Sequence, residues 1–172
     1  MCGQHKKEPL STLAVFRITG VVLRQAMECS AAYFSYGRDG RLRVLDSFLH
    51  PKVEHYNYDY YAGVEYAFDI SRPVGSRVVK LEYQGAPVRD RDSFSICLNS
   101  HRASGARGYE CYLNCPVEWE INLEISDLLL EYFKQYRENI FLPLSPFFVI
   151  DAHHIQQASA RDMADAILPA EY

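Results

Sequence analysis

The sequence lacks a long apolar run and an excess of positive charge. No stretch approaches the roughly 20 apolar residues of a membrane-spanning helix, and the N-terminal MCGQHKKEP has no apolar segment that resembles a signal peptide. The formal net charge is -4, whereas proteins that coat the phosphates of nucleic acids usually carry a basic face. We therefore expect neither a membrane span nor a nucleic acid polymer as partner, and no cellular address can be read from the chain.

Familiar catalytic and metal-binding motifs are also missing. The 5 cysteines are an odd set without C-x-x-C spacing, which predicts reduced thiols, although Cys111 and Cys115 are close enough for a local pair. The 6 histidines have no carboxylate at ligand spacing, and no G-x-S-x-G, Walker or G-x-G-x-x-G motif occurs. We expect no catalytic residue and no metal site in this chain.

What is present is enough for one folded domain. The chain has 172 residues, of which 48% are hydrophobic, and this composition is typical of a globular protein with a buried core. We predict a domain over residues 10–150, preceded by a disordered or non-native N-terminus over residues 1–9. Residues 151–172 are predicted to form a C-terminal tail with some helical character.

The hydrophobic pattern predicts a strand that runs into a helix near the N-terminus. Residues 10–18 alternate and are rich in β-forming types, and Thr19 can cap a helix that follows. Apolar residues continue at helical spacing as far as Phe34. Residues 37–40 (GRDG) predict a turn, and the segment to Tyr61 predicts irregular structure.

The remaining pattern predicts three strands, a helix and a closing strand. We expect residues 64–70, 77–83 and 94–99 to form an antiparallel meander. Residues 125–139 predict an amphipathic helix capped by Ser126 or Asp127, and residues 147–150 predict the last strand. This order favours an α+β fold with mixed or antiparallel sheets packed with helices.

One loop carries more chemistry than the others. The segment from Asn99 to Tyr109 follows a predicted strand and combines an amide, glycines, two arginines and an aromatic residue that we expect to be exposed. Tyr109 can offer a stacking face to a flat base, and Asn99 can read polar edges or brace the loop. An ordinary structured turn is the alternative interpretation.

Three motifs, in order, resemble one known family. Residues 16–34 resemble a T-G-x-x-L-x-x-x-L-E-x-S segment, and residues 57–88 resemble a G-[IV]-x-Y-x-I-D-x-S-x-x-x-G-x-R-[IV] run that continues to G-x-P-[IV]. Residues 96–109 resemble an N-x-x-R-A-x-G-G-x-G-Y loop. All three are features of the C-terminal domain of the 5'-nucleotidase and 2',3'-cyclic-nucleotide 2'-phosphodiesterase family, and together they span most of residues 10–150.

The resemblance implies a substrate-recognising domain rather than a complete enzyme. In that family an N-terminal metallophosphoesterase domain holds two divalent metal ions and activates a metal-bound water, while the C-terminal domain grips the nucleoside. The resemblance implies that this chain is the substrate-specificity domain of a hydrolase and is inactive when isolated. Its expected partners are a nucleotide or nucleoside substrate and the N-terminal domain of the parent protein. A secreted, periplasmic or cell-wall-associated bacterial parent is implied.

The family's substrate-binding loop maps onto five residues here: Asn99, Arg102, Gly105, Gly108 and Tyr109. The R-A-x-G form of the loop favours the branch that hydrolyses 2',3'-cyclic nucleotides and 3'-nucleotides. The alternatives are the specificity domain of a 5'-nucleotidase or UDP-sugar hydrolase, and a stand-alone nucleoside-binding module.

The chain also departs from the family pattern. Pro9 and Leu10 stand near the position of the first stacking aromatic, so half of the expected base sandwich is missing. Ala106 and Arg107 replace smaller or acidic loop residues. Tyr58 and Tyr60 lie in an aromatic-rich segment, where core or rim packing is the expected role.

Overall fold

The chain folds as two compact units, each built from segments that are separate in the sequence. A computed structural model describes residues 11–135, 148–151 and 154–156. The first unit comprises Met1–Ile18 and Ser93–Leu142, and the second comprises Thr19–Asp92 and Pro143–Tyr172. Each unit is described by itself below.

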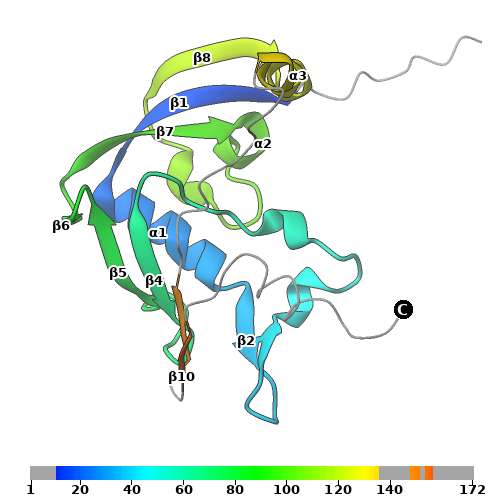
Figure 1. Cartoon of the computed structure of the whole chain (residues 1–172), viewed down its shortest axis with the longest axis vertical. Helices are drawn as coiled ribbons and strands as arrows, with labels where there is room; N and C mark the ends of the chain where they lie inside the picture. Colours follow the sequence, from blue (N-terminus) through cyan, green and yellow to red (C-terminus); the bar gives the residue numbers. More distant parts are fainter. Residues whose placement is uncertain (1–10, 136–147, 152–153, 157–172) are drawn as a thin grey trace, which may run out of the picture. The chain divides into compact units, whose positions relative to one another are not determined.

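A three-stranded sheet forms the centre of the first unit. It contains β1 (Thr12–Thr19), β7 (Ser93–Asn99) and β8 (Val117–Glu124) in the order β7-β1-β8 (Figure 1). Strand β8 is antiparallel to β1. Two short helices, α2 (Ser100–Ala103) and the 3-10 turn Glu110–Tyr112, lie between β7 and β8, and α3 (Ile125–Gln135) follows β8 directly.

The second unit contains a mixed sheet and a helix. The sheet has the order β10-β9-β4-β5-β6. Its strands are β4 (Glu65–Asp69), β5 (Val78–Tyr83), β6 (Ala86–Pro87), β9 (Phe148–Asp151) and β10 (His154–Gln156). Strand β4 is antiparallel to β5 and parallel to β9, so the fold is α+β with a mixed sheet, as the sequence predicted.

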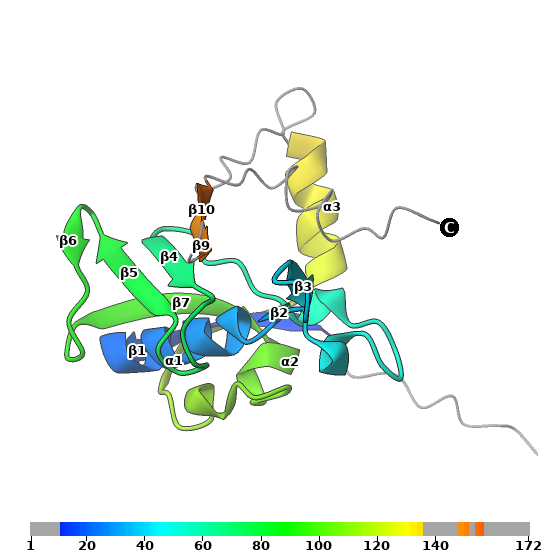
Figure 2. The ribbon, with the colours of Figure 1, turned by 90° about the horizontal axis from the view of Figure 1, so that it is seen from below.

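Helix α1 (Gly20–Ala31) packs against β5 and supplies much of the core of the second unit (Figure 2). Leu23, Ala26 and Met27 on the helix are buried, as are Phe68 and Leu81 on the sheet. After α1 the chain forms the hairpin β2 (Phe34–Tyr36) and β3 (Leu42–Val44), then two 3-10 turns, Asp46–Phe48 and His55–Asn57. In the tyrosine-rich segment, Tyr58 packs against Tyr33 and Phe34, whereas Tyr56 and Tyr60 are largely exposed.

Several sequence predictions need correction. Residues 94–99 were expected to complete a meander, but β7 pairs with β1 in the other unit instead. Strand β8 was not predicted, and His154–Gln156 form a strand where a helical tail was expected. Helix α1 ends at Ala31 rather than near Phe34, because the buried Phe34 ring is already part of strand β2. The predicted end of the last helix at residue 139 lies outside the described residues.

Thr19 occupies the predicted N-cap position of α1, but its side chain makes no capping hydrogen bond. The backbone of a distant segment replaces it. The amides of Gly20 and Val21 donate to the carbonyl oxygens of Asp92 (2.8 Å) and Asp90 (3.1 Å). These are two of the amide groups that a helix N-terminus leaves without intrahelical partners, so residues 90–92 act as the cap.

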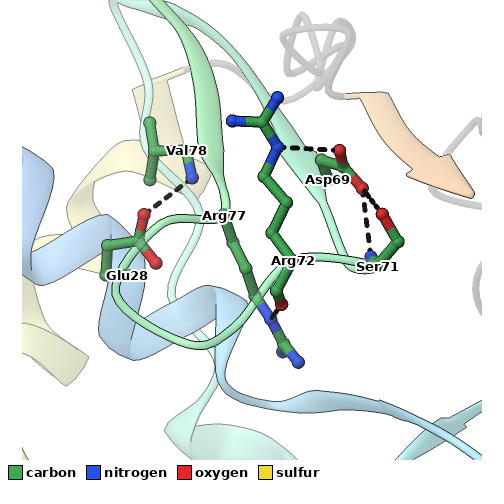
Figure 3. Close-up of polar contacts among 6 residues, drawn as sticks. All are labelled: Glu28, Asp69, Ser71, Arg72, Arg77 and Val78. Carbon is green, nitrogen blue, oxygen red and sulfur yellow. Dashed lines mark hydrogen bonds and ion pairs between the residues drawn. The ribbon is translucent and has the colours of Figure 1, made fainter. Parts of the chain in front are cut away.

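Buried charges in the second unit are paired with backbone groups. The Glu28 carboxylate on α1 accepts hydrogen bonds from the amides of Gly75 (2.9 Å) and Val78 (2.7 Å). The Arg77 guanidinium donates to the carbonyl oxygens of Ala31 (2.8 Å) and Arg72 (2.9 Å), among others. Figure 3 shows Glu28 reaching Val78 and Arg77 reaching Arg72. These bonds join α1 to the β4–β5 connection and satisfy two charges that would otherwise be costly to bury.

The turn after β4 is held by a second carboxylate, that of Asp69. The Asp69 side chain accepts bonds from the Ser71 hydroxyl (2.6 Å), the Ser71 amide (3.0 Å) and the Arg72 Nε (3.0 Å), as Figure 3 also shows. The hydrogen bond from the Ser71 side chain, helped by Arg72, holds the pKa of Asp69 below its ordinary value. The carboxylate therefore fixes the start of the β4–β5 turn at neutral pH.

None of the helices in the described part of the chain has the length and hydrophobicity to span a bilayer.

The contact between α1 and its backbone cap leaves no room for a side chain at Gly20. A Cβ atom there would lie 2.1 Å from the Arg89 carbonyl oxygen and 2.9 Å from Val88 Cγ1. We predict that Gly20→Ala destabilises the protein by about 2 kcal/mol or more, because backbone rather than a flexible side chain must move. Chemical denaturation measures this change, and Val21→Ala on the exposed side of the same turn should cost about 0.5 kcal/mol or less. Equal stability of Gly20→Ala and the native chain would contradict the packing described.

Glu28→Ala removes the acceptor for the buried Val78 amide and for the part-buried Gly75 amide. We expect a loss of about 3 kcal/mol, since unsatisfied buried donors keep their full desolvation cost. The matched control is Glu65→Ala, because the Glu65 carboxylate bonds the Lys80 ammonium (2.9 Å) at the surface. That exposed pair should contribute little to stability. Similar melting temperatures for the two variants would show that Glu28 does not anchor the helix.

Candidate functional site

The candidate site is the loop that begins where β7 ends. Asn99, the last residue of β7, is the N-cap of α2, and its Oδ1 accepts the Arg102 amide proton at 2.7 Å. Asparagine is among the preferred residues at this position, because its short side chain can satisfy a free amide of the first turn. Asn99 therefore braces the loop, which was one of the two roles considered for it.

Arg102 lies under the loop rather than on its surface. Its side chain is buried, with 5% of the residue exposed, and its guanidinium carbon lies 3.9 Å from the centre of the Tyr109 ring. Nη1 also donates to the Ala106 carbonyl oxygen at 3.2 Å. A cation over an aromatic face in a desolvated setting contributes about 2 kcal/mol. Arg102 thus joins the start of the loop to its middle and its end.

Tyr109 was predicted to be exposed, and this is wrong. Only 1% of the residue is accessible, because the ring packs beneath Arg102 and parallel to Tyr112, with ring centres 6.1 Å apart and 9° between the planes. In this arrangement the ring presents no open face to a base. Its assignment to the substrate site stays a prediction, and any contribution in this conformation is indirect, through the shape of the loop.

Three residues in the left-handed region fold the loop back on itself. Gly105, Arg107 and Gly108 have φ values of 76°, 61° and 90°. At Gly105 an added Cβ would also lie 3.0 Å from Leu113 Cγ, so glycine is needed there for two reasons. The two predicted glycines are therefore what allows Tyr109 to return beneath α2.

The exposed planar side chains of this loop are His101 and Arg107. Neither was among the residues predicted for the site. Neighbouring side chains of a helix point about 100° apart, so His101 can be exposed while Arg102 is buried, but this could not be told from the sequence. An imidazole offers a flat face and a hydrogen-bonding edge, and a guanidinium can stack on a base or bind a phosphate.

All five predicted site residues lie in one unit and in one short segment, from Asn99 to Tyr109. The positions expected to replace the first stacking aromatic, Pro9 and Leu10, lie outside the described residues. Tyr58 and Tyr60 belong to the other unit. Tyr58 is half-buried with its ring centre 5.2 Å from that of Tyr33, and Tyr60, 58% exposed, packs edge-on against Tyr58. The predicted core and rim roles of these two tyrosines are confirmed.

Cysteine and histidine chemistry is limited in the described residues. Cys29, Cys97, Cys111 and Cys115 are thiols rather than disulfides there, and Cys115 donates to the Cys111 carbonyl oxygen at 3.4 Å. Burial raises the pKa of the Cys115 thiol, which disfavours a reactive thiolate. Within the same ranges, no group of three or more His, Cys, Asp or Glu residues is placed to hold a metal ion.

Comparison with known proteins finds relatives that are named as nucleotide phosphoesterases or nucleotidases. The chain is 25% identical over 134 residues to the trifunctional nucleotide phosphoesterase of Bacillus subtilis, covering 71% of this chain and 9% of that protein. It is 32% identical over 107 residues to the 2',3'-cyclic-nucleotide 2'-phosphodiesterase/3'-nucleotidase of Haemophilus influenzae, covering 55% of this chain and 16% of that protein. The chain thus spans a sixth or less of these relatives.

Solved structures agree on the fold. A putative 5'-nucleotidase from Staphylococcus aureus superimposes with a TM-score of 0.76 at 34% identity, covering 82% of this chain and 27% of that one. The 5'-nucleotidase precursor of Thermus thermophilus, at 20% identity and a TM-score of 0.59, has the same fold. The family model described as "5'-nucleotidase, C-terminal domain" matches residues 9–114. This chain therefore belongs to the 5'-nucleotidase C-terminal domain family.

Proposed function

We propose that this chain is the nucleoside-recognising domain of a two-domain, metal-dependent phosphohydrolase that acts on 2',3'-cyclic nucleotides and 3'-nucleotides. The observation that carries the proposal is the R-A-x-G loop, Arg102 to Gly105, built on a strand end within a domain of this family. The similarity to the 2',3'-cyclic-nucleotide 2'-phosphodiesterase/3'-nucleotidase of Haemophilus influenzae supports the choice of substrate class. Loops positioned by a rigid scaffold are where binding residues are usually found.

Recognition is divided between buried and exposed residues of the loop. Asn99, Arg102 and Tyr109 hold the backbone in one conformation, so little entropy is lost when a ligand binds. The exposed His101 supplies a flat face for the base, and the exposed Arg107 supplies a positive charge for the phosphate. Gly108, also exposed, lets the ligand approach the backbone closely.

Hydrolysis itself is assigned to a preceding domain, which would hold two divalent metal ions and supply an activated water. The residues of this chain bind and orient the nucleoside. Orientation is a substantial contribution to rate, since a correctly held substrate needs no further search for the reactive geometry.

A 5'-nucleotidase specificity domain is the second candidate. The Staphylococcus aureus protein, a putative 5'-nucleotidase, shares 34% identity with this chain and covers 82% of it. The two candidates share the nucleoside-binding role and differ in the phosphate position that the complete enzyme accepts. Comparing 3'-AMP, 5'-AMP and 2',3'-cyclic AMP as ligands separates them. A third reading, a free-standing nucleoside-binding module, shares the binding prediction and needs no catalytic domain.

The isolated chain is expected to hydrolyse no nucleotide. We predict no phosphate release from 2',3'-cyclic AMP, 3'-AMP or 5'-AMP with added Mn²⁺, Co²⁺ or Zn²⁺, because the described residues offer no group of metal ligands. Released phosphate is measured over hours against a metallophosphoesterase as positive control. Turnover that co-purifies with the chain and disappears in a loop variant would refute the assignment.

Substitutions in the loop distinguish residues that contact the ligand from residues that hold the loop in its conformation. We predict that His101→Ala weakens adenosine or AMP binding by about 1 to 3 kcal/mol without lowering the melting temperature. Tyr109→Ala should lose binding together with about 3 kcal/mol of stability, since it empties a buried aromatic site. Calorimetric titration and thermal unfolding measure the two effects.

The matched control is His50→Ala, an exposed histidine in the other unit, which should change neither quantity. Unchanged affinity in His101→Ala would remove this side chain from the site. If the Tyr109→Ala protein lost affinity but kept its full stability, the tyrosine would instead be a direct contact of the ligand.

A further inference from the structure

The tip of the β2–β3 hairpin carries a chemically reactive pair of residues that the proposed function does not use (Figure 1). Strands β2 and β3 are joined through a turn at residues 37–40 (GRDG), and Tyr36 pairs with Leu42 across it. In the whole sequence, Asp39 is the one aspartate that is followed by a glycine, and no asparagine is. Glycine has no Cβ, so it does not hinder attack by its own amide nitrogen on the side chain before it.

The reaction open to this pair needs no reagent but water. The Gly40 amide nitrogen bonds to Cγ of the protonated Asp39 carboxyl group, and the amide proton leaves with the carboxyl hydroxyl as water. The product is a succinimide ring, and water then adds to one of its two carbonyl carbons and opens it. Opening at the former side-chain carbon restores aspartate. Opening at the main-chain carbon leaves isoaspartate, in which the chain runs through Cβ and Cγ, with no net change of mass.

The turn is open to solvent. The Asp39 side chain is 41% exposed. Gly40 has a φ of 74°, and apart from its chain neighbours no heavy atom lies within 4 Å of the place where a Cβ would stand. Packing therefore does not keep water away from these two residues.

Hydrogen bonds engage both reacting groups instead. Asp39 Oδ2 accepts from Arg43 Nη2 at 2.8 Å, and Oδ1 accepts from the Arg41 amide at 3.2 Å. The Gly40 amide donates to the Gly37 carbonyl oxygen at 3.0 Å. In the folded hairpin the carboxylate is thus held towards β3, and the amide nitrogen that would attack it is bonded elsewhere.

Arg43 makes the strongest of these contacts with the carboxylate. Its hydrogen bond, followed by that of the Arg41 amide, holds the pKa of Asp39 below the ordinary value. Ring closure expels water from a protonated carboxyl group, so this contact also reduces the reactive fraction. The arginine reaches Asp39 across Gly37, where an added Cβ would lie 2.9 Å from Arg43 Cδ and 2.6 Å from Asp39 Oδ1.

We propose that Asp39 is a modification site, at which the chain rearranges spontaneously to isoaspartate, and that the hydrogen bond from Arg43 slows this reaction in the folded hairpin. The proposal is independent of nucleoside binding. Its product would lengthen the main chain inside a turn that is closed by the Gly37 amide and the Arg41 carbonyl oxygen, 2.8 Å apart. Isoaspartate should therefore loosen the end of the hairpin.

The test follows the intact chain for several weeks in mildly acidic buffer, folded and in urea. Peptide mapping identifies isoaspartate, because its peptide has unchanged mass, elutes separately and resists a protease that cuts before aspartate. We expect isoaspartate to accumulate at Asp39 but not at Asp46, which is exposed and followed by a serine. Accumulation at Asp39 should be fastest in urea, where the hairpin is open.

Arg43→Ala should raise the rate in the folded chain by about threefold, an effect of the size that an exposed ion pair can have. Arg43→Thr should act in the same way, and its side chain suits a strand. The matched control is Arg41→Ala, because the Arg41 side chain is also exposed but its Nε lies 3.9 Å from Asp39. This variant keeps the residue 41 amide and the Arg43 bond, so it should react at the native rate.

Circular dichroism verifies that each variant is folded. Absence of isoaspartate at Asp39 in urea, or no more of it there than at Asp46, would overturn the assignment of the site. Equal rates in the native chain and both Arg43 variants would overturn the protective role of the hydrogen bond. Equal acceleration by Arg41→Ala would do the same, because it would show an effect of net charge alone.

Discussion

The contact between the Arg102 guanidinium and the Tyr109 ring is the interaction on which the candidate site depends. It lies at 3.9 Å in a buried setting and connects the first turn of α2 to the end of the loop. With Asn99 capping the same turn, the loop is fixed at its beginning and its end. The conformation of the exposed residues between them follows from these buried contacts. In the proposed function, the residues that meet the nucleoside are therefore different from the residues that make the loop rigid.

In the second unit, too, buried charged side chains hold backbone segments in place. Glu28 and Arg77 are buried and bonded to backbone groups rather than to each other's side chains in the bonds described above. Backbone partners do not move independently of the fold, so these charges define the packing of α1 on the β4–β5 connection. In both units, then, a buried polar side chain positions a backbone segment, and apolar packing around it supplies most of the stabilisation.

Elements with strong local patterns could be predicted from the sequence. Helix α1, helix α3 and strands β4 and β5 follow from periodicity, and the family was indicated by three motifs in order. Pairing could not be predicted in the same way: alternation identified β7 as a strand but carries no information on whether it joins β5 or β1. The burial of Tyr109 was missed because it requires three residues of positive φ, of which Arg107 is a residue type that seldom adopts that conformation. The cap of α1 was missed because it comes from residues about 70 positions away.

The central claim is that the exposed side of the 99–109 loop recognises a nucleoside. An NMR titration of the ¹⁵N-labelled chain with adenosine tests it most directly, because every described amide is observed at once. The account predicts saturable shifts concentrated in the amides from Asn99 to Tyr109, with those of α1 and β4 unchanged. Shifts that leave this loop unaffected, or no saturable shift at millimolar adenosine, would contradict it.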